Sequence, residues 1–356
     1  MQSEKYSRDN AGQSLKKYIL LKKGELAYNH GASKAKQYGC CYELTEDEAR
    51  IPYVYHCFKV SGAEHTPYVA TALNNPKIDR QLKRLVSSSV RMDGLLNISF
   101  DDYMSVILHL PSLKEQTHIA DFLKKLDERI TAQEKLVASL KKYKRGVFEA
   151  IFSQKLRLVP TELQKPWKQY KLSDFATRVT RKNGNQTDIP LTISAQYGLI
   201  DQRDFFSKTV ASTDMSGYYL LQKGEYAYNR STSNDYPFGS IKRLELYPMG
   251  AVSTLYLCFA IKEEVVNSDL AKWYFESSRW YKGINNICAE GARNHGLLNV
   301  PTDGFFNTVH TLPSDPNEQL AVVDYLSNIQ KKYEAAQRCL QAIENVRSGL
   351  LQQLFI

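Results

Sequence analysis

The chain has 356 residues, of which 43% are hydrophobic and 24% are charged. This composition is ordinary for a soluble globular protein, so extended disorder is not expected, and the length suits two domains that each bury a core. The sequence shows no signal peptide and no apolar run of about 18 residues, which argues against export and membrane insertion. The formal net charge of +9 weakly favours a polyanionic partner. We therefore expect a cytoplasmic protein without a membrane partner.

Six cysteines are scattered along the chain, and none belongs to a Cys-x-x-Cys pair. No pair of histidines has the spacing of a zinc site either. We therefore expect reduced thiols, as is usual in the cytosol, and no metal site. The cysteines are Cys40, Cys41, Cys57, Cys258, Cys288 and Cys339.

The sequence contains an internal repeat, which sets the expected architecture. Residues 18–29 match residues 218–229 at a separation of 200 positions. The separation then grows slowly to 203, as duplication followed by small loop insertions would produce. The later matching blocks are Cys57-Phe58 with Cys258-Phe259, Gly94–Asn97 with Gly296–Asn299, and Glu115-Gln116 with Glu318-Gln319.

The front part of each copy predicts a mixed α+β globule. Residues 18–29 and 218–229 each suggest a strand, a turn at a glycine and a second strand. Short apolar runs predict buried strands, and longer periodic segments predict helices. The strands are expected at 54–58 and 255–259, and the helices at 76–87 and 270–281.

The rear part of each copy predicts one long amphipathic helix. Apolar residues recur every three or four positions, with one extra step of four near the start, which is the seam of a coiled coil with a small stutter. Gln133, Lys144 and Arg347 interrupt the seam, and polar residues at such positions commonly fix the register. The apolar positions are Ile119, Phe122, Leu126, Ile130, Val137, Leu140, Val147 and Ile151, then Val322, Tyr325, Ile329, Tyr333, Ala336, Leu340, Ile343, Leu350 and Leu354.

Neither helix can bury such a stripe alone. Two copies in one chain are expected to pack on each other in antiparallel orientation, each spanning somewhat over 50 Å at about 1.5 Å per residue. The alternative, in which each helix docks on its own globule, stays open.

The order of several segments matches a known family. The segments are Leu-Pro-Ser-Leu-Lys-Glu-Gln at 110–116, Leu-Lys-Lys-Tyr-Lys-Arg-Gly at 140–146, Phe-Ser-Gln-Lys-Leu-Arg at 152–157, Pro-Trp-Lys-Gln-Tyr-Lys-Leu-Ser-Asp-Phe at 166–175, and the stretches 228–233 and 291–299. The first three closely resemble the spacer helix of the specificity (S) subunit of type I restriction-modification enzymes. The others are similar to segments of that family's target recognition domain. The resemblance covers the whole chain.

The resemblance implies an α+β protein with two target-recognition globules in pseudo-two-fold repeat, separated by two long helices that form an antiparallel coiled coil. Each globule would read one half of a bipartite target in double-stranded DNA. The helices would set the spacing and dock two methyltransferase (M) subunits, which restriction/translocase (R) subunits join. S-adenosylmethionine, ATP and Mg would be used by those partners, with no cofactor for this chain. The implied segments are recognition domain 1 (1–110), spacer helix 1 (111–157), recognition domain 2 (158–312) and spacer helix 2 (313–356).

The first recognition domain departs from the family pattern. Met1 aligns near Asp201, so the first copy has no counterpart of roughly residues 167–201, which should supply the opening strands. The first domain is therefore expected to be truncated, complemented by another fragment, or unable to read a normal half-site.

The sequence shows no catalytic motif. It has no P-loop, no dinucleotide-binding glycine pattern, and no Asn/Asp-Pro-Pro-aromatic loop of the kind with which adenine methyltransferases grip a flipped base. We therefore expect a non-catalytic protein. One alternative is a coiled-coil protein that bridges two partners without reading DNA. Another is a stand-alone nuclease or methyltransferase, against which the missing motifs count.

Polar loops after the predicted strands supply the candidate DNA contacts. Arg can bond guanine through two N–H groups, Gln and Asn can read adenine, and Ser, Thr and Tyr can bond phosphates. The same residues also suit ordinary polar turns, so that alternative stays open. The candidates are Asn29, His30, Lys34, Lys36 and Arg91 in the first copy, and Arg181, Lys182, Gln196, Tyr197, Asn229, Arg230, Ser231, Thr232, Ser233, Arg293 and His295 in the second.

Overall fold

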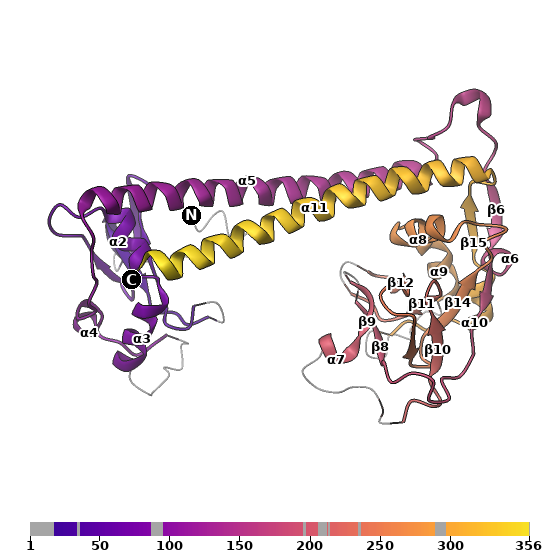
Figure 1. The fold of residues 1–356 in the computed structure, drawn as a ribbon, viewed down its shortest axis with the longest axis horizontal. Helices are drawn as coiled ribbons and strands as arrows, with labels where there is room; N and C mark the ends of the chain where they lie inside the picture. Colours follow the sequence, from indigo (N-terminus) through magenta and orange to yellow (C-terminus); the bar gives the residue numbers. More distant parts are fainter. Residues whose placement is uncertain are drawn as a thin grey trace. The chain divides into compact units, whose positions relative to one another are not determined.

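The computed structural model describes residues 18–33, 36–86, 95–194, 197–205, 212, 214–233, 236–288 and 297–355. It divides into two compact units. Unit 1 combines residues 1–136 with 336–356, and unit 2 comprises residues 137–335. Each of the two long helices, α5 (Leu113–Phe152) and α11 (Pro316–Leu354), therefore contributes one part to each unit (Figure 1). None of the described helices is long and apolar enough to cross a membrane.

Unit 2 is built around an antiparallel sheet of four strands in the order β12-β11-β14-β7. The central strands are rich in aromatic and apolar residues and are almost wholly buried, as expected for strands covered on both faces. Three strand pairs, β10-β13, β8-β9 and β15-β6, complete the unit. The strands are β6 (Lys168–Lys171), β7 (Ala176–Arg178), β8 (Leu191–Ser194), β9 (Gly198–Asp201), β10 (Tyr219–Gln222), β11 (Tyr226–Asn229), β12 (Ser240–Arg243), β13 (Met249–Val252), β14 (Leu257–Ile261) and β15 (Val309–Leu312).

Short helices connect these strands. The helix predicted at 270–281 is two helices, because Ser277 adopts extended backbone geometry and its hydroxyl donates to the Tyr274 carbonyl oxygen at 2.6 Å, which ends the first helix. The helices are η2 (Thr161–Leu163), α6 (Leu172–Phe175), α7 (Gln202–Phe205), α8 (Ser268–Glu276), α9 (Tyr281–Ile287) and α10 (Thr302–Phe306).

Aromatic side chains dominate the core of unit 2. Tyr228 stacks on Phe305 with ring centroids 4.9 Å apart, and Tyr226 stacks on Phe259 at 5.2 Å. Offset stacks of this kind add stability beyond the area that they bury. The same core includes Phe148, Ile151 and Phe152 from the end of α5, and Val322, Leu326 and Ile329 from the start of α11.

Unit 1 repeats part of this design. It contains a three-stranded antiparallel sheet in the order β3-β2-β5 and the strand pair β1-β4. The strand–turn–strand elements predicted at 18–29 and 218–229 are therefore present in both units. The elements are β1 (Tyr18–Lys22), β2 (Leu26–Asn29), β3 (Cys40–Glu43), β4 (Glu48–Pro52), β5 (His56–Phe58), α2 (Thr66–Ala72), α3 (Pro76–Leu85) and α4 (Phe100–Met104).

The two units correspond element by element over most of their length. The strands β1 to β5 take the places of β10 to β14, and the helices α2, α3 and α4 take those of α8, α9 and α10. Among the described residues, unit 1 has no element in the place of β6, α6, β7, β8 or β9. The segment equivalent to β15, residues 106–110, forms no strand.

The two long helices run antiparallel, as their contacts show in each unit. In unit 1 the Gln133 side-chain amide donates to the Ala336 carbonyl oxygen at 2.8 Å. In unit 2 the Lys144 ammonium donates to the Gln330 side chain at 2.6 Å. Arg347 forms a two-point ion pair with Asp127, and one of its two bonds is 3.1 Å long. The three polar residues expected in the seam, Gln133, Lys144 and Arg347, therefore all form contacts between the helices.

Two seam residues at the helix starts, Phe122 and Tyr325, were wrongly expected to be buried, although the Tyr325 hydroxyl lies 3.2 Å from that of Tyr143 on α5. Phe122 is 51% exposed and Tyr325 is 36% exposed, whereas the next residues, Leu123 and Leu326, are buried. The reason is that each helix start packs on the globule of its own unit together with the end of the other helix. Leu123 belongs to a cluster with Tyr68, Ala72, Ala120 and Phe355, and Leu326 belongs to the core of unit 2.

Candidate nucleic-acid interface

Each unit carries the same polar loop after its central strand, and we call these the asparagine loops: residues 29–36 in unit 1 and 229–236 in unit 2. Asn229 ends β11, and its side-chain oxygen accepts from the backbone N–H of Ser231 at 3.0 Å. Asn29 ends β2 and accepts in the same way from Gly31 at 2.9 Å. A side chain that mimics a backbone turn in this manner reverses the chain just beyond the strand.

The tip of each asparagine loop is closed by a second pair of contacts. Ser233 and Tyr236 exchange two backbone hydrogen bonds of 3.1 Å. In unit 1 the equivalent residues Ser33 and Lys36 do the same, at 2.9 and 3.2 Å. In both units two backbone hydrogen bonds therefore join the described residues on either side of the loop tip.

Each asparagine loop is also tied to the repeated Leu-Leu-Asn block. Ser231 forms an isolated bridge with Leu297, and the N–H of Leu298 donates to the Arg230 carbonyl oxygen at 3.0 Å. Gly31 bridges Leu95 in the same way. The two blocks that repeat in the sequence, the Tyr-Asn strand end and the Leu-Leu-Asn motif, are thus neighbours in space in both units.

A glycine makes the close return of the chain possible. Gly239 has φ +78° and Gly39 has φ +80°, the left-handed region that L side chains rarely adopt. A Cβ atom at Gly239 would lie less than 3.0 Å from the Asn229 carbonyl oxygen, and one at Gly39 would lie equally close to that of Asn29. Any larger residue would therefore displace the asparagine loop.

His30 and Arg230, both expected to contact DNA, each bond backbone carbonyls of their own unit. His30 is 4% exposed, and its ring nitrogens lie 3.0 Å from the Leu96 carbonyl oxygen and 2.6 Å from that of Val54. A neutral imidazole can donate to only one of these at a time. Arg230 is half-buried and donates to the carbonyl of Leu255, the residue equivalent to Val54, at 2.9 Å. In this structure both side chains hold equivalent backbone positions.

Other candidates in the second copy also have partners within the protein. Arg181 donates to Glu225 at 2.6 Å, and Lys182 donates to the Gly217 carbonyl oxygen at 2.8 Å while its ammonium lies 4.6 Å from the Tyr219 ring centre. Both remain exposed, so their contacts compete with solvent. In unit 1 the half-buried Lys36 donates to the Asn74 carbonyl oxygen at 3.2 Å.

The remaining candidates divide into exposed residues and residues outside the described part. Tyr197 is 61% exposed in the turn between β8 and β9. Ser231 and Ser233 are exposed on the asparagine loop, and Thr232 between them is half-buried. Lys34, Arg91, Gln196, Arg293 and His295 lie outside the described residues.

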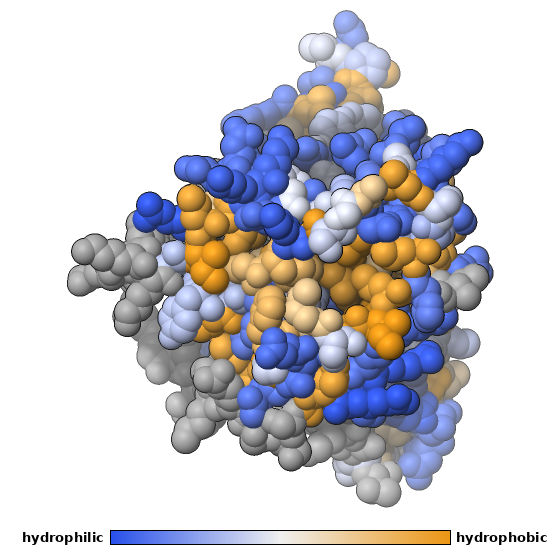
Figure 2. All heavy atoms as spheres, turned by 90° about the vertical axis from the view of Figure 1, so that its left-hand side faces the viewer, coloured by the Kyte–Doolittle hydropathy of each residue, from blue (hydrophilic) through white to orange (hydrophobic). Residues whose placement is uncertain are grey.

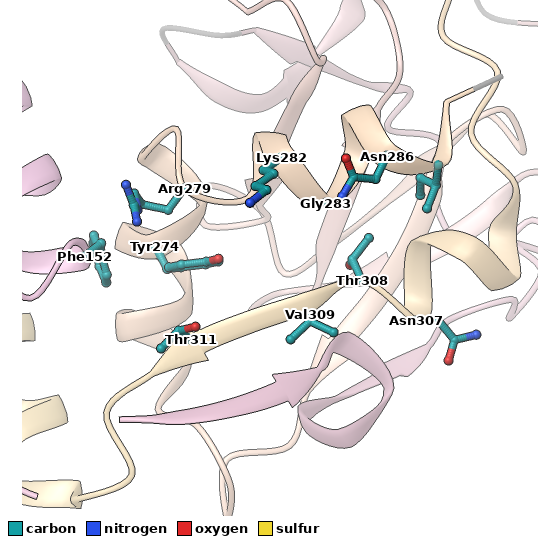
Figure 3. A pocket seen from close by; sticks show the side chains of 11 residues that line it. Phe152, Tyr274, Arg279, Lys282, Gly283, Asn286, Asn307, Thr308, Val309 and Thr311 are labelled. Atoms are coloured by element: carbon teal, nitrogen blue, oxygen red, sulfur yellow. The ribbon is translucent and has the colours of Figure 1, made fainter. Parts of the chain in front are cut away.

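Unit 2 also contains a basic pocket that the sequence patterns did not predict. It has a volume of about 420 Å³, and Arg279 and Lys282 extend from one wall toward it while Thr308 and Thr311 line the other (Figure 3). Phe152, at the end of α5, closes one end. Both cations are exposed and form no ion pair among the described residues. Two unpaired cations beside hydroxyl groups suit a phosphate.

Unit 1 has an equivalent basic pocket. Its volume is about 300 Å³, and it is lined by Lys77 and Arg80, with Phe355 from the end of α11. The cations occupy the positions equivalent to Arg279 and Lys282, and Phe355 is equivalent to Phe152 in the repeat. In both copies two cations three positions apart flank a buried apolar residue, Ile78 or Trp280, a short pattern that could have been found in the sequence.

The asparagine loop and the basic pocket of unit 2 belong to one structural block. Phe238, just after the loop, packs on Tyr281, which lies between the two cations in sequence, with ring centroids 5.3 Å apart. The Tyr228 hydroxyl donates to the Phe238 carbonyl oxygen at 2.8 Å, and its ring meets Trp280 edge-on at 5.8 Å. Burial raises the pKa of the Tyr228 hydroxyl, so it stays a neutral donor. These contacts fix the loop and the pocket relative to each other.

Known proteins share this architecture. No family model and no curated protein matches the sequence. Similar solved structures include the type I restriction-modification system S subunit from M. genitalium, with a TM-score of 0.52 at 13% identity over 96% of this chain and 85% of that one. A chain from a study of complex assembly and conformational transition of the type I R-M system gives 0.54 at 12% identity over 97% and 84%. The HsdS subunit from Thermoanaerobacter tengcongensis gives 0.49 at 13% over 94% and 81%.

The first two similarities extend over nearly the whole chain, so they include both long helices together with both units. The low identity means that the fold, rather than individual residues, is what these proteins share with it. The chain therefore has the fold of the specificity subunits of type I restriction-modification systems.

Proposed function

We propose that this chain is the DNA sequence-specificity subunit of a type I restriction-modification enzyme and has no catalytic site of its own. One observation carries the proposal: two units of the specificity-subunit fold repeat the same asparagine loop, tied to the same Leu-Leu-Asn block. A reader of a two-part target needs two such surfaces with polar groups that reach base edges. In unit 2 the exposed Ser231, Ser233 and Tyr197 are the best placed.

The basic pockets would supply contacts to the DNA backbone. Arg279 and Lys282 in unit 2, and Lys77 and Arg80 in unit 1, are exposed cations at equivalent positions. Phosphate contacts fix the orientation of a protein on DNA without reading its sequence. The repetition of this pair in both units supports a role common to both half-sites.

The paired helices would set the gap between the half-sites. A helix of 40 residues is about 60 Å long. The contacts of Gln133 with Ala336 and of Lys144 with Gln330 fix the register of one helix on the other. A fixed register gives a fixed gap.

The outer faces of the helices would dock two methyltransferase subunits, which restriction/translocase subunits join. Apolar side chains that remain exposed on a helix face suit a protein interface. Methylation and cleavage would then belong to the partners, which would use S-adenosylmethionine, ATP and Mg in the cytoplasm. Among the described residues, no group of three or more His, Cys, Asp or Glu could hold a metal. The exposed apolar residues on the helices are Phe122, Leu136, Tyr143, Leu320 and Val346.

Co-expression with the methyltransferase subunit of the same system tests the proposal. The chain is expected to co-purify with that subunit, and the complex is expected to retain a subset of genomic DNA fragments at moderate salt. Sequencing of the retained fragments should show one two-part motif, because specific contacts persist where electrostatic binding weakens. The double variant Asn229→Ala/Ser231→Ala should lose one half of the motif, whereas Glu162→Ala, exposed in η2, should leave both halves unchanged.

Two outcomes would contradict the proposal. If the chain does not co-purify with the methyltransferase subunit, it does not dock that subunit. A complex that retains all fragments equally would leave the alternative, a coiled-coil bridge without sequence readout.

A further inference from the structure

Unit 1 leaves open an edge that unit 2 covers. In unit 2, β7 pairs with the outer edge of β14, with Phe259 opposite Arg178 and Ile261 opposite Ala176. In unit 1 the equivalent strand, β5, pairs only with β2 among the described residues. Phe259 is fully buried, whereas its counterpart Phe58 is only half-buried.

A second segment beside it forms no strand, and the backbone of its residue Ile107 is bonded to the Gln81 side chain. In unit 2, β15 pairs with β6 along its full length, with His310 opposite Tyr170 and Leu312 opposite Lys168. The equivalent residues of unit 1, 106–110, have the sequence Val-Ile-Leu-His-Leu, which strongly favours a strand. They form none, and among the described residues the backbone N–H groups of 108–110 make no hydrogen bond. Unpaired backbone groups beside apolar side chains are a template for an added strand.

The segment that fills this place in unit 2 is short and specific. Between β6 and β7, the helical turn α6 inserts Leu172 and Phe175, both fully buried, into the core. The Leu172 N–H donates to the Thr308 carbonyl oxygen at 2.9 Å, and the Lys262 N–H donates to that of Phe175 at 2.8 Å. The segment therefore bonds both strand edges at once.

Apolar surface at the corresponding place in unit 1 is exposed to solvent. Leu110 is 38% exposed, whereas its counterpart Leu312 is fully buried, and Met104 on α4 is 48% exposed. Figure 2 views unit 1 from the side on which α5 begins and shows a contiguous apolar area framed by polar side chains. Exposed apolar residues such as Leu110 and Met104, next to unpaired strand edges, mark a site for another polypeptide.

We infer that the edge formed by residues 58–60 and 104–110 of unit 1 binds a strand–helical turn–strand polypeptide segment that lies outside residues 18–355. Its chemistry follows from unit 2: two short strands flanking a turn with apolar side chains three positions apart, as at Leu172 and Phe175. Residues 1–17 lack this pattern. In unit 1 the contact residues equivalent to Thr308 and His310 are Val106 and Leu108, so the site is more apolar than in unit 2.

A synthetic peptide with the sequence of residues 165–181 is the probe, labelled with a fluorophore and added to the full chain. We expect saturable binding with one peptide per chain, because the equivalent place in unit 2 is already filled. The amide hydrogens of residues 108–110 should exchange at least about tenfold more slowly in the complex, since they gain partners. A peptide with Leu172→Ser and Phe175→Ser should not bind.

Variants of the chain locate the site. Leu110→Lys places a charge on the apolar edge and should weaken peptide binding about tenfold or more. Leu246→Lys, which alters an exposed leucine of unit 2, should leave it unchanged. Leu110 is partly exposed, so a lysine there should not unfold the chain. An unchanged circular dichroism spectrum verifies that the variant is folded.

A second experiment links the segment covalently to the chain, so that weak binding is not mistaken for no binding. Residues 165–201 are joined by a flexible linker ahead of residue 18, which removes the need for strong binding between separate molecules. Absence of both peptide binding and amide protection in the linked chain would overturn the inference. If the chain instead forms dimers that Leu110→Lys dissociates, the occupant is a second copy and the inference is wrong. Because these tests measure only binding to unit 1, their failure would leave DNA reading by unit 2 untouched.

Discussion

Gln133 donates a hydrogen bond to the carbonyl oxygen of Ala336, the residue that occupies its own position in the repeated helix. Equivalent residues meet in this way when two copies of one helix pair antiparallel. The pairs on either side agree: Lys144 contacts Gln330 in unit 2, and their counterparts Arg347 and Asp127 contact each other in unit 1. At this position of the repeat, unit 2 pairs Lys144 with the neutral amide of Gln330, whereas unit 1 has the ion pair of Arg347 and Asp127.

Lys144 provides a test of what the seam requires. Its ammonium is surrounded by the rings of Phe148, Trp273 and Tyr333 at 5.3 to 5.9 Å, and burial lowers its pKa. Lys144→Met keeps the side-chain stem and removes the buried charge, so the free energy of unfolding should be unchanged or higher. Lys144→Ala removes the stem and should cost about 2 kcal/mol.

Urea denaturation of both variants gives these free energies. Lys141→Ala, on the exposed face of the same helix, is the control and should have no effect. An equal loss for the methionine and alanine variants would show that the charge itself, rather than the packing of its stem, stabilises the pair.

Gly239 tests the construction of the asparagine loop. Gly239→Ala combines an unfavourable positive φ with a steric overlap between the new Cβ and the Asn229 carbonyl oxygen. Gly224 has φ +92° but no neighbouring atom within 4 Å of the place that a Cβ would occupy, so Gly224→Ala should cost only the backbone strain of about 1 to 2 kcal/mol. Gly239→Ala should cost clearly more and should also weaken DNA binding. Thermal unfolding and a DNA-binding titration measure the two effects, and equal losses for both variants would refute the close approach.

His310 predicts an acid sensitivity of unit 2. The Thr308 hydroxyl donates to the Phe305 carbonyl oxygen, so it accepts from His310 Nε2–H at 2.8 Å, and Nδ1 accepts from the Tyr274 hydroxyl at 3.0 Å. Burial lowers the pKa of His310 from 6.5 to about 4. Below pH 6.5 the unfolded chain therefore binds a proton that the folded chain refuses, and stability falls as the pH drops toward 4.

The expected loss is about 2 kcal/mol between pH 7.5 and pH 5, given the size of this shift. Guanidinium denaturation at both pH values measures it. His310→Leu introduces the residue found at the equivalent position of unit 1, Leu108, and should remove this part of the pH dependence. An undiminished pH dependence in the variant would assign the effect to other groups.

The basic pockets predict a change in salt dependence. Arg279→Ala/Lys282→Ala should weaken DNA binding and lower the slope of log affinity against log salt by about 1 for each phosphate that the variant no longer neutralises. The motif that is read should not change. Lys331→Ala/Lys332→Ala removes the same charge from an exposed face of α11 and serves as the control. Equal slopes in the two double variants would show that the pocket does not contact DNA.

Much of the architecture could be predicted because it rests on periodicity. The repeat, the two long helices and the strand–turn–strand elements follow from spacing that is local to each segment. The seam at the helix starts could not be predicted, because whether Phe122 or Leu123 is buried depends on the globule that packs there, and that packing is long-range.

The partners of the candidate DNA contacts within the protein could not be predicted from the sequence. Residue type alone suggested that His30 and Arg230 face DNA, but each bonds a backbone carbonyl supplied by a distant strand connection. The repeated pair of cations can be found in the sequence, but the pockets themselves could not be predicted because their walls come from separate parts of the chain. Arg279 and Phe152 are far apart in sequence, and only the fold brings them to one cavity.

The proposed function requires that this chain choose the DNA sequence on which a methyltransferase acts. A genome-wide map of methylated bases tests this requirement, in cells that express the partner methyltransferase subunit with and without this chain. We expect methylation that depends on the chain, at a two-part motif with one constant gap, half of which changes in Asn229→Ala/Ser231→Ala. Methylation that is absent in both cells, or identical in both, would contradict the proposed function.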